Sequence, residues 1–204
     1  MFDFHLHFVS RELLSNAKSL GYSGLGIVNA PLPEQSPVPL FRGLEISPKN
    51  AQDARRFLSG SFDFSLMHSS SVELARSCGK LVDILALDFN NLVYDPVIAA
   101  GICDAFVEFD LSSIIFSDRR MQAMSNLAKA VEIARKSDNR IIVSLRPKNE
   151  WQLRSLSDMR DLVEFLGFSR SESKEALIAN PKALAELISV RKSKAYVSKD
   201  VKLA

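Results

Sequence analysis

The chain has 204 residues, of which 47% are hydrophobic and 25% are charged, and its formal net charge is +2. These values are ordinary for a globular domain, so they exclude disordered, collagen-like and low-complexity proteins. The sequence lacks a long uncharged apolar run and the basic and apolar regions of a signal peptide, so we expect neither a membrane span nor secretion. The two cysteines, Cys78 and Cys103, predict small core residues, no disulfide framework and a reducing, cytoplasmic location.

Charge is divided unevenly along the chain. Residues 1–110 hold 8 Lys and Arg against 13 Asp and Glu, whereas residues 111–204 hold 18 against 11. The two parts therefore carry net charges of −5 and +7. This asymmetry favours a basic face contributed by the second half, with scattered, solvated helix faces as the alternative.

Short β-rich runs alternate with helical stretches along most of the chain. Several runs are almost continuously apolar, as expected for parallel strands that are covered on their outer face. Predicted strands span residues 2–8, 22–28, 40–46, 62–68, 82–87, 105–111 and 140–146. The proline-rich residues 30–39 predict a loop. After the last strand the pattern is helical only, over residues 149–157, 158–166, 170–179 and 181–190.

Side chains that can cap a helix predict where several helices begin. Such residues occur, with a following proline or a glutamate three positions later in most cases, at Ser10, Ser47, Ser70, Asp95, Ser169 and Asn180. In the long helix predicted over residues 118–137, Met121 and Met124 share a face with apolar residues, so we expect both to lie in the core.

Seven strands alternating with helices predict a parallel α/β fold, either a closed TIM-like barrel or an open doubly wound sheet. A full barrel typically needs about 250 residues, so a closed barrel in this chain must be compact. We expect one domain over residues 1–190, including the closing helices, followed by a frayed basic tail over residues 191–204.

The first predicted strand carries a histidine motif. Asp3, His5 and His7 alternate along it, which predicts that all three side chains point to one face. Two imidazoles beside a carboxylate could ligate zinc or a similar metal, and Glu45 and His68 on other strands could complete the site. This pattern resembles the start of the polymerase-and-histidinol-phosphatase (PHP) superfamily, whose barrel begins with an H-x-H strand.

The chain departs from that superfamily in its second half. The superfamily completes a multi-metal site with late ligands, including an Asp-x-His, whereas no histidine follows His68 in this chain. We therefore do not expect a three-metal phosphoesterase centre. A metal-free, hydrogen-bonded polar cluster is the expectation, and a reduced site with one or two ions stays open as the alternative.

The second half contains an ordered series of short motifs. These are RIIVSL at 140–145, Arg146-Pro147, WQLRSLSD at 151–158, LVEFLG at 162–167, SKEA at 173–176 and Asn180-Pro181. Together with the opening FDFHLH, this series resembles the ribonuclease P protein component 3 family, the archaeal counterpart of the thirty-kilodalton subunit of the eukaryotic enzyme. The resemblance extends from residue 2 to about residue 190.

The resemblance implies a PHP-related barrel without hydrolytic metals or other cofactors, and without catalytic residues of its own. It implies a protein subunit of ribonuclease P, which removes the 5′ leader from precursor tRNA and whose RNA carries out the chemistry. The implied partners are the ribonuclease P RNA, precursor tRNA, the component 2 subunit and other protein subunits. A free-standing metal-dependent phosphoesterase of the PHP superfamily is the alternative function.

Basic residues of the second half are the candidate RNA contacts. Phosphate neutralisation by Lys and Arg supplies most of the affinity of proteins for RNA. Some candidates match the basic residues of the family, and others follow the last strand at the end of the barrel where ligands bind. The predicted RNA-binding residues are Arg119, Arg120, Arg146, Lys148 and Arg154.

Overall fold

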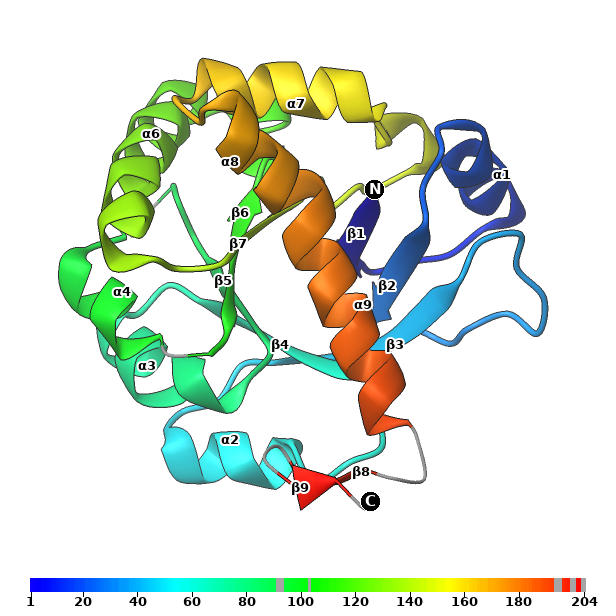
Figure 1. Cartoon of the computed structure of the whole chain (residues 1–204), viewed down its shortest axis with the longest axis horizontal. Helices are drawn as coiled ribbons and strands as arrows, with labels where there is room; N and C mark the ends of the chain where they lie inside the picture. The colour runs from blue at the N-terminus through cyan, green and yellow to red at the C-terminus, as the bar shows by residue number, and fades with distance from the viewer. Residues whose placement is uncertain (91–93, 103, 193–195, 199–200, 203–204) are drawn as a thin grey trace.

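The computed structural model describes residues 1–204 except 91–93, 103, 193–195, 199–200 and 203–204. Seven parallel strands form one sheet in chain order, and this sheet curls into a nearly closed barrel (Figure 1). The strands are β1 (Phe2–Leu6), β2 (Gly24–Val28), β3 (Leu40–Ile46), β4 (Phe64–Ser69), β5 (Ile84–Leu87), β6 (Phe106–Asp110) and β7 (Ile141–Ser144). All seven predicted strands are present, and the barrel alternative is confirmed.

Helices connect most successive strands and surround the barrel (Figure 1). They are α1 (Arg11–Ser19), α2 (Ala51–Phe57), α3 (Val72–Cys78), α4 (Pro96–Gly101), α5 (Ser112–Ile115), α6 (Arg120–Ser137), α7 (Leu156–Phe165), α8 (Arg170–Lys174) and α9 (Asn180–Arg191). Short 3₁₀ turns occupy Gly79–Leu81 and Glu150–Gln152, and a π-helical turn over Glu175–Ala179 joins α8 to α9. The connection between β2 and β3 is a loop, as predicted, and contains no helix.

Three of the six predicted helix caps agree with the structure. The confirmed N-caps are Ser10, Asp95 and Ser169. The prediction of Ser47 is wrong, because α2 begins three residues later and Asn50 caps it; α3 is likewise capped by Ser71 and not by Ser70. Asn180 is the first residue of α9 but does not cap it, since its side chain donates a hydrogen bond of 2.8 Å to the Ile141 carbonyl and a π-helical turn leads directly into the helix.

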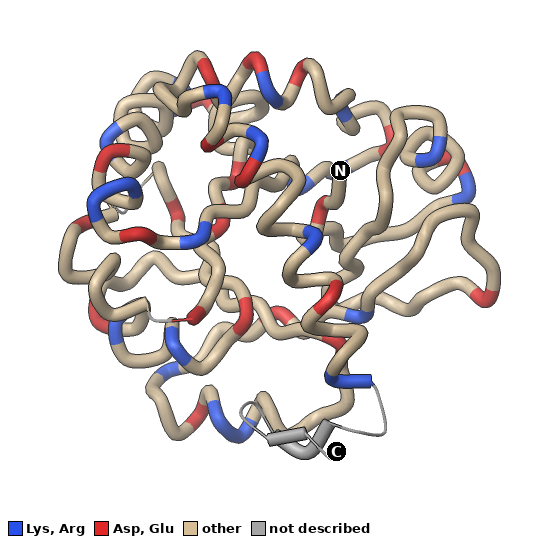
Figure 2. The backbone as a smooth tube through the Cα atoms, viewed as in Figure 1, with Lys and Arg blue, Asp and Glu red and all other residues tan. Residues whose placement is uncertain are grey.

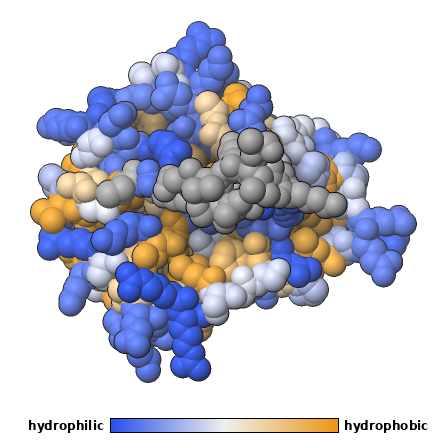
Figure 3. Space-filling model, turned by 60° about the horizontal axis from the view of Figure 1, so that its bottom comes forward, coloured by the Kyte–Doolittle hydropathy of each residue, from blue (hydrophilic) through white to orange (hydrophobic). Residues whose placement is uncertain are grey.

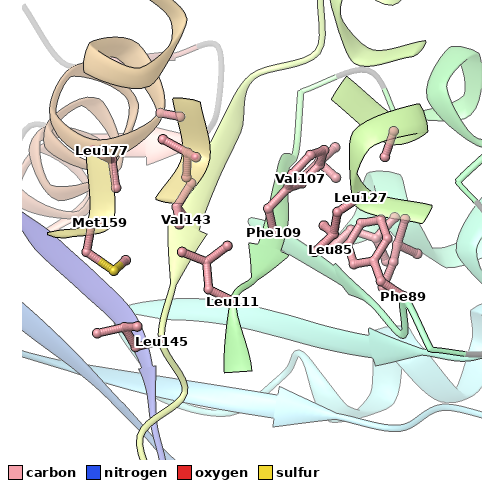
Figure 4. Packing of buried hydrophobic residues seen from close by; sticks show 14 of the residues in the cluster. Leu85, Phe89, Val107, Phe109, Leu111, Leu127, Val143, Leu145, Met159 and Leu177 are labelled. Atoms are coloured by element: carbon pink, nitrogen blue, oxygen red, sulfur yellow. The ribbon is translucent and has the colours of Figure 1, made fainter. Parts of the chain in front are cut away.

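The larger hydrophobic core lies between the barrel and its ring of helices. Strand residues that point outward pack against the helices there, and Figure 4 shows Leu85, Val107 and Phe109 among them. Cys78 belongs to this core, as predicted, whereas Cys103 lies outside the described residues.

Helix α6 turns a different face to this core than the one that the sequence predicted. Its buried residues are Ala123, Asn126, Leu127, Ala130, Val131 and Ala134. Met124 is partly buried beside them, but Met121 is 76% exposed, so the prediction of a buried methionine pair is wrong for Met121. Met121 lies in the first turn of the helix, before the first buried residue, Ala123.

A second core fills the interior of the barrel at the N-terminal ends of the strands. It consists of Phe4, Val28, Phe64, Leu66, Ile84, Ala86, Phe106, Ile142 and three residues of α9, with Phe2 and Phe41 packed against it. Phe4 and Phe64 meet edge to face at 5.3 Å between ring centroids. Gly26 makes room for both rings, because a Cβ there would lie 2.7 Å from Phe64.

Helix α9 covers this end of the barrel (Figure 1). Its contribution to the interior core is Leu184, Ala185 and Ile188. At the end of the helix, Arg191 pairs with Asp83 at 2.6 Å and Lys192 pairs with Asp63 at 2.8 Å. The first residues of the predicted basic tail are thus tethered to the barrel. Beyond them the structure has a small antiparallel sheet of β8 (Tyr196–Ser198) and β9 (Val201–Lys202), which the prediction of a frayed tail missed.

Acidic and basic residues alternate along the outer helices, without a long stretch of one sign (Figure 2). On the face shown in Figure 3, hydrophilic side chains protrude and hydrophobic ones lie between them. Among the described residues, no helix is both long and apolar enough to cross a bilayer.

Candidate functional site at the barrel mouth

The C-terminal ends of the strands form a polar mouth. Residues two positions apart on a strand point to the same face, and on several strands an apolar residue of the barrel interior is followed two positions later by a polar one. Thus Leu66 is followed by His68 and Phe106 by Glu108. The polar side chains at this level are His5, His7, Glu45, His68, Glu108, Asp110 and Ser144. Beside them a cavity of about 850 Å³ opens, lined in part by His7, His68, Asp110, Arg146 and Lys148.

His5 and Glu108 form a buried pair at the base of the mouth. His5 Nδ1 lies 2.7 and 3.0 Å from the two oxygens of Glu108, and the Ser144 hydroxyl donates to the same carboxylate. Burial alone lowers the pKa of His5, but the charge and the hydrogen bond of Glu108 outweigh it and raise the pKa to about 10. Burial opposes ionisation of Glu108 as well, yet His5 holds the pKa of that carboxyl below its ordinary value. The His5–Glu108 pair together with Ser144 therefore links β1, β6 and β7.

Glu45 brings the second histidine into the same cluster. One of its oxygens lies 3.3 Å from His7 Nε2, and the other lies 3.8 Å from His5 Nε2. Burial raises the pKa of Glu45, but the nearby His5 outweighs it and brings the pKa down to about 2. His7 is 41% exposed, and burial followed by the charge of His5 lowers its pKa. His5, His7 and Glu45 offer ligand atoms that all lie within 4.8 Å of one another.

Asp3 does not join this cluster, so the predicted alternation of three side chains on one face is wrong there. The pairing of β1 with β2 changes register between Asp3 and Leu6, which interrupts the alternation. The buried Asp3 carboxylate instead accepts hydrogen bonds from the backbone N–H groups of His5, at 3.0 Å, and Leu145, at 2.9 Å. In the part of the chain that the structure describes, β7 and β1 share no backbone ladder. Asp3 therefore bridges the open seam of the barrel.

His68 lies at the mouth but outside the cluster. It is half-buried on β4 and lines the cavity. Burial, followed by the charge of Arg146, lowers its pKa. The prediction placed His68 in the same potential site as His5 and His7. The structure puts it on the same rim, but not within ligand distance of them among the described groups.

Three of the predicted RNA contacts border the mouth. Arg146 follows β7 with a left-handed backbone (φ 44°), and its guanidinium lies 3.8 Å from the Asp110 carboxylate. Lys148 is exposed on the same cavity wall. Arg119 is exposed beside a neighbouring cavity that shares Ser117 and Asp118 with the first. Arg146 and Lys148 therefore line one cavity, and Arg119 lines an adjoining one.

The other two predicted contacts also hold their own segments in place. Arg120 donates from Nε to the Ile114 carbonyl at 2.8 Å, and a second nitrogen reaches the Ile115 carbonyl, so it satisfies the free carbonyls that end α5. Arg154 donates to the carbonyls of Trp151 and Leu153 at 2.9 and 3.0 Å. Next to Arg154 in the chain, Ser155 and Asp158 form the capping box that starts α7.

The sequence prediction missed Glu108, Asp110 and Ser144. Glu108 and Asp110 lie on a strand that is otherwise apolar, and they alternate as His5 and His7 do. An acidic residue on the inward face of a covered strand must meet a cation or hydrogen-bond donor, so this alternation was the signal that could have found them.

The fold and the mouth define a TIM-like α/β barrel whose C-terminal mouth is lined by histidines, carboxylates and basic side chains. A model of the family "RNase P subunit p30" matches residues 5–193, and the chain belongs to this family. This assignment confirms the predicted resemblance and the function of a ribonuclease P protein subunit over that of a free-standing phosphoesterase.

Relatives of known name agree with this assignment. Ribonuclease P protein component 3 of Methanosarcina acetivorans is 24% identical over 99% of this chain and 95% of its own length. The protein of the same name from Methanosarcina mazei is 26% identical over 90% of this chain and 87% of its own length. A chain in a cryo-EM structure of archaeal ribonuclease P with mature tRNA has the same fold, with a TM-score of 0.84, 15% identity and coverage of 99% of this chain and 97% of that one.

Proposed function

We propose that this chain is a non-catalytic, RNA-binding subunit of a ribonuclease P that removes the 5′ leader from precursor tRNA, with the RNA carrying out the chemistry. The observation that carries this proposal is the family match over residues 5–193. The fold of the chain also recurs in a ribonuclease P structure that includes mature tRNA. The cysteine content of the sequence supports a cytoplasmic location.

The RNA-contacting surface in this proposal is the basic side of the mouth. Arg119, Arg146 and Lys148 border adjoining cavities, so they can reach one stretch of phosphate backbone. Arg120 and Arg154 complete the proposed surface and, through their carbonyl contacts, keep the neighbouring segments in shape. Contacts of this kind neutralise phosphates with little preference for sequence.

The test is cleavage of precursor tRNA by a holoenzyme reconstituted with the ribonuclease P RNA and the other protein subunits. We expect the paired variants Arg146→Ala/Lys148→Ala and Arg119→Ala/Arg120→Ala to reduce cleavage and RNA binding. Arg55→Ala/Arg56→Ala serves as the control, because both arginines are exposed on α2 in the acidic half. Normal activity of both mouth variants together with an inactive α2 variant would place the RNA elsewhere.

The component 2 subunit is the proposed protein partner. The proposal rests on the family and not on a particular surface of this chain. The two proteins, co-purified, should form either a 1:1 complex or a dimer of heterodimers, and light scattering at micromolar concentration should give one defined mass. Two separate monomers at that concentration would count against the partnership.

The isolated chain should not hydrolyse phosphodiesters, because the late ligands of a multi-metal centre are missing from its sequence. A generic phosphodiester substrate tests this with and without chelator. Turnover that chelator abolishes and that disappears in His5→Ala would support the phosphoesterase alternative.

A further inference from the structure

The two histidines and Glu45 at the mouth have the geometry of a site for one metal ion. Their ligand atoms lie within 4.8 Å of one another, with 3.8 Å from His5 Nε2 and 3.3 Å from His7 Nε2 to the Glu45 carboxylate. Tetrahedral zinc with nitrogen and oxygen ligands at about 2.0–2.2 Å holds its donors roughly 3.4 Å apart. The two histidine–carboxylate separations, which end on different oxygens of Glu45, are close to those that zinc imposes.

The orientation of His5 supplies an independent argument. Its Nδ1 is hydrogen-bonded to the Glu108 carboxylate, at 2.7 and 3.0 Å from the two oxygens. This contact turns the ring so that Nε2 faces Glu45 and His7. His5 is fully buried, and its Nε2 is the one buried side-chain nitrogen or oxygen without a hydrogen-bond partner in the described part of the chain. A carboxylate behind a histidine whose other nitrogen faces the ligand position is the usual second layer of a metal site. A buried nitrogen without a partner is costly, and a metal ion would satisfy it.

The charges around the cluster also favour an added cation. The carboxylates of Glu45, Glu108 and Asp110 gather at the mouth, and Arg146 lies 3.8 Å from the Asp110 carboxylate. Buried carboxylates in excess of cations are unfavourable unless something compensates them. A divalent cation at the cluster compensates them.

We propose that His5 Nε2, His7 Nε2 and Glu45 bind one divalent cation, with zinc preferred over magnesium. Imidazole ligands suit zinc, whereas magnesium favours oxygen ligands in octahedral geometry. His7 lines the mouth cavity, so a fourth position on the ion faces solvent there. The ion joins β1 to β3 and corresponds to the one-ion alternative that the sequence left open.

The experiment uses the full-length chain without a tag, freed of metal by chelator and then titrated with zinc chloride or magnesium chloride in a calorimeter. Elemental analysis after dialysis gives the stoichiometry. We expect one zinc per chain, an increase in thermal midpoint with zinc, and no saturable binding of magnesium at the same concentrations. His7→Ala and Glu45→Gln should each weaken zinc binding at least tenfold.

His68→Ala is the matched control, because His68 lies on the same rim outside the cluster. The zinc affinity of this variant should equal that of the wild-type chain. His7 is 41% exposed, so its substitution spares the fold, which circular dichroism checks. Two results would overturn the proposal: no zinc bound at micromolar concentration by the wild-type chain, or zinc retained with unchanged affinity in both His7→Ala and Glu45→Gln.

Discussion

The two ends of the barrel are built from the same seven strands but differ in chemistry. At the N-terminal end, aromatic and aliphatic side chains fill the interior, and α9 covers them. At the C-terminal end, two to three residues further along the same strands, the interior side chains are histidines, carboxylates and a serine beside an open cavity. The N-terminal end is therefore a packed hydrophobic core, and the C-terminal end is the candidate functional site.

This division shows how one strand can serve stability and function together. Moving two positions along a strand keeps the side chain on the same face, so Phe106 and Glu108 share an inward row but belong to different layers. Substitutions in the lower layer should act on folding, whereas substitutions at the rim should act on binding. The buried polar layer between them should affect both.

The largest effect is expected in the lower layer. Phe64→Ala removes a fully buried ring that packs against Phe4 and over Gly26. Truncation of a buried phenylalanine costs about 3–5 kcal/mol in the free energy of unfolding. Urea denaturation followed by circular dichroism measures this loss. Phe57→Ala, at a ring that is 47% exposed, is the control and should cost much less. Equal losses for the two variants would contradict the assignment of a separate interior core.

The buried polar layer should come second. Glu108→Gln removes the charge that holds His5 and accepts from Ser144, while its amide oxygen can still accept one hydrogen bond. Hydrogen bonds to charged groups contribute about 1.5–3 kcal/mol, so we expect a loss of that size in urea denaturation. Asp161→Asn, at a side chain that is 70% exposed, should leave stability unchanged. A neutral effect of Glu108→Gln would mean that the pair contributes little to closing the barrel.

The sequence predicted the barrel well because its strands carry strong local signals. Parallel strands covered on both faces appear as apolar runs, and each of the seven was recognisable without knowledge of its neighbours. The pairing of His5 with Glu108 could not be predicted in the same way. These residues are 103 positions apart, and their contact depends on how the sheet closes.

The errors have local physical causes. Asp3 left the predicted face because one irregularity in β1 breaks the period of two, and nothing in the residues 3–7 indicates it. Asn180 was predicted as a cap, but its side-chain amide donates a hydrogen bond to the Ile141 carbonyl on β7. The two residues come close to each other only in the folded chain. Arg120 and Arg154 were recognisable as basic, whereas their contacts with carbonyls depend on the turns around them.

At the rim, substitutions should change binding with little effect on folding. Arg146→Ala/Lys148→Ala removes two cations beside the mouth cavity. If each contacts one phosphate, the slope of log K against log salt should fall by about 0.7–0.9 per contact. Filter binding of precursor tRNA by the reconstituted complex at several salt concentrations gives this slope. An unchanged slope in a variant of normal stability would remove these two residues from the proposed RNA surface.

The smallest effect is expected far from both barrel ends, at the contact between α6 and α8. Arg135 donates to both oxygens of Glu172, at 2.6 and 2.8 Å, and this contact lowers the pKa of Glu172 from 4.5 to about 2 although burial opposes it. Because the pKa is lower in the folded chain, the contribution of the pair is present above pH 4.5 and disappears as the pH falls toward 2. Exposed pairs contribute little, so Arg135→Ala should lower the thermal midpoint at pH 7 by no more than about 2–4 °C. The difference from the wild type should shrink in scans at progressively lower pH.

Lys129→Ala, an exposed residue of the same helix, controls for the loss of a positive charge. A difference between Arg135→Ala and the wild type that stays constant down to pH 2.5 would show that Arg135 acts through its hydrogen bond to the Gly167 carbonyl and not through Glu172.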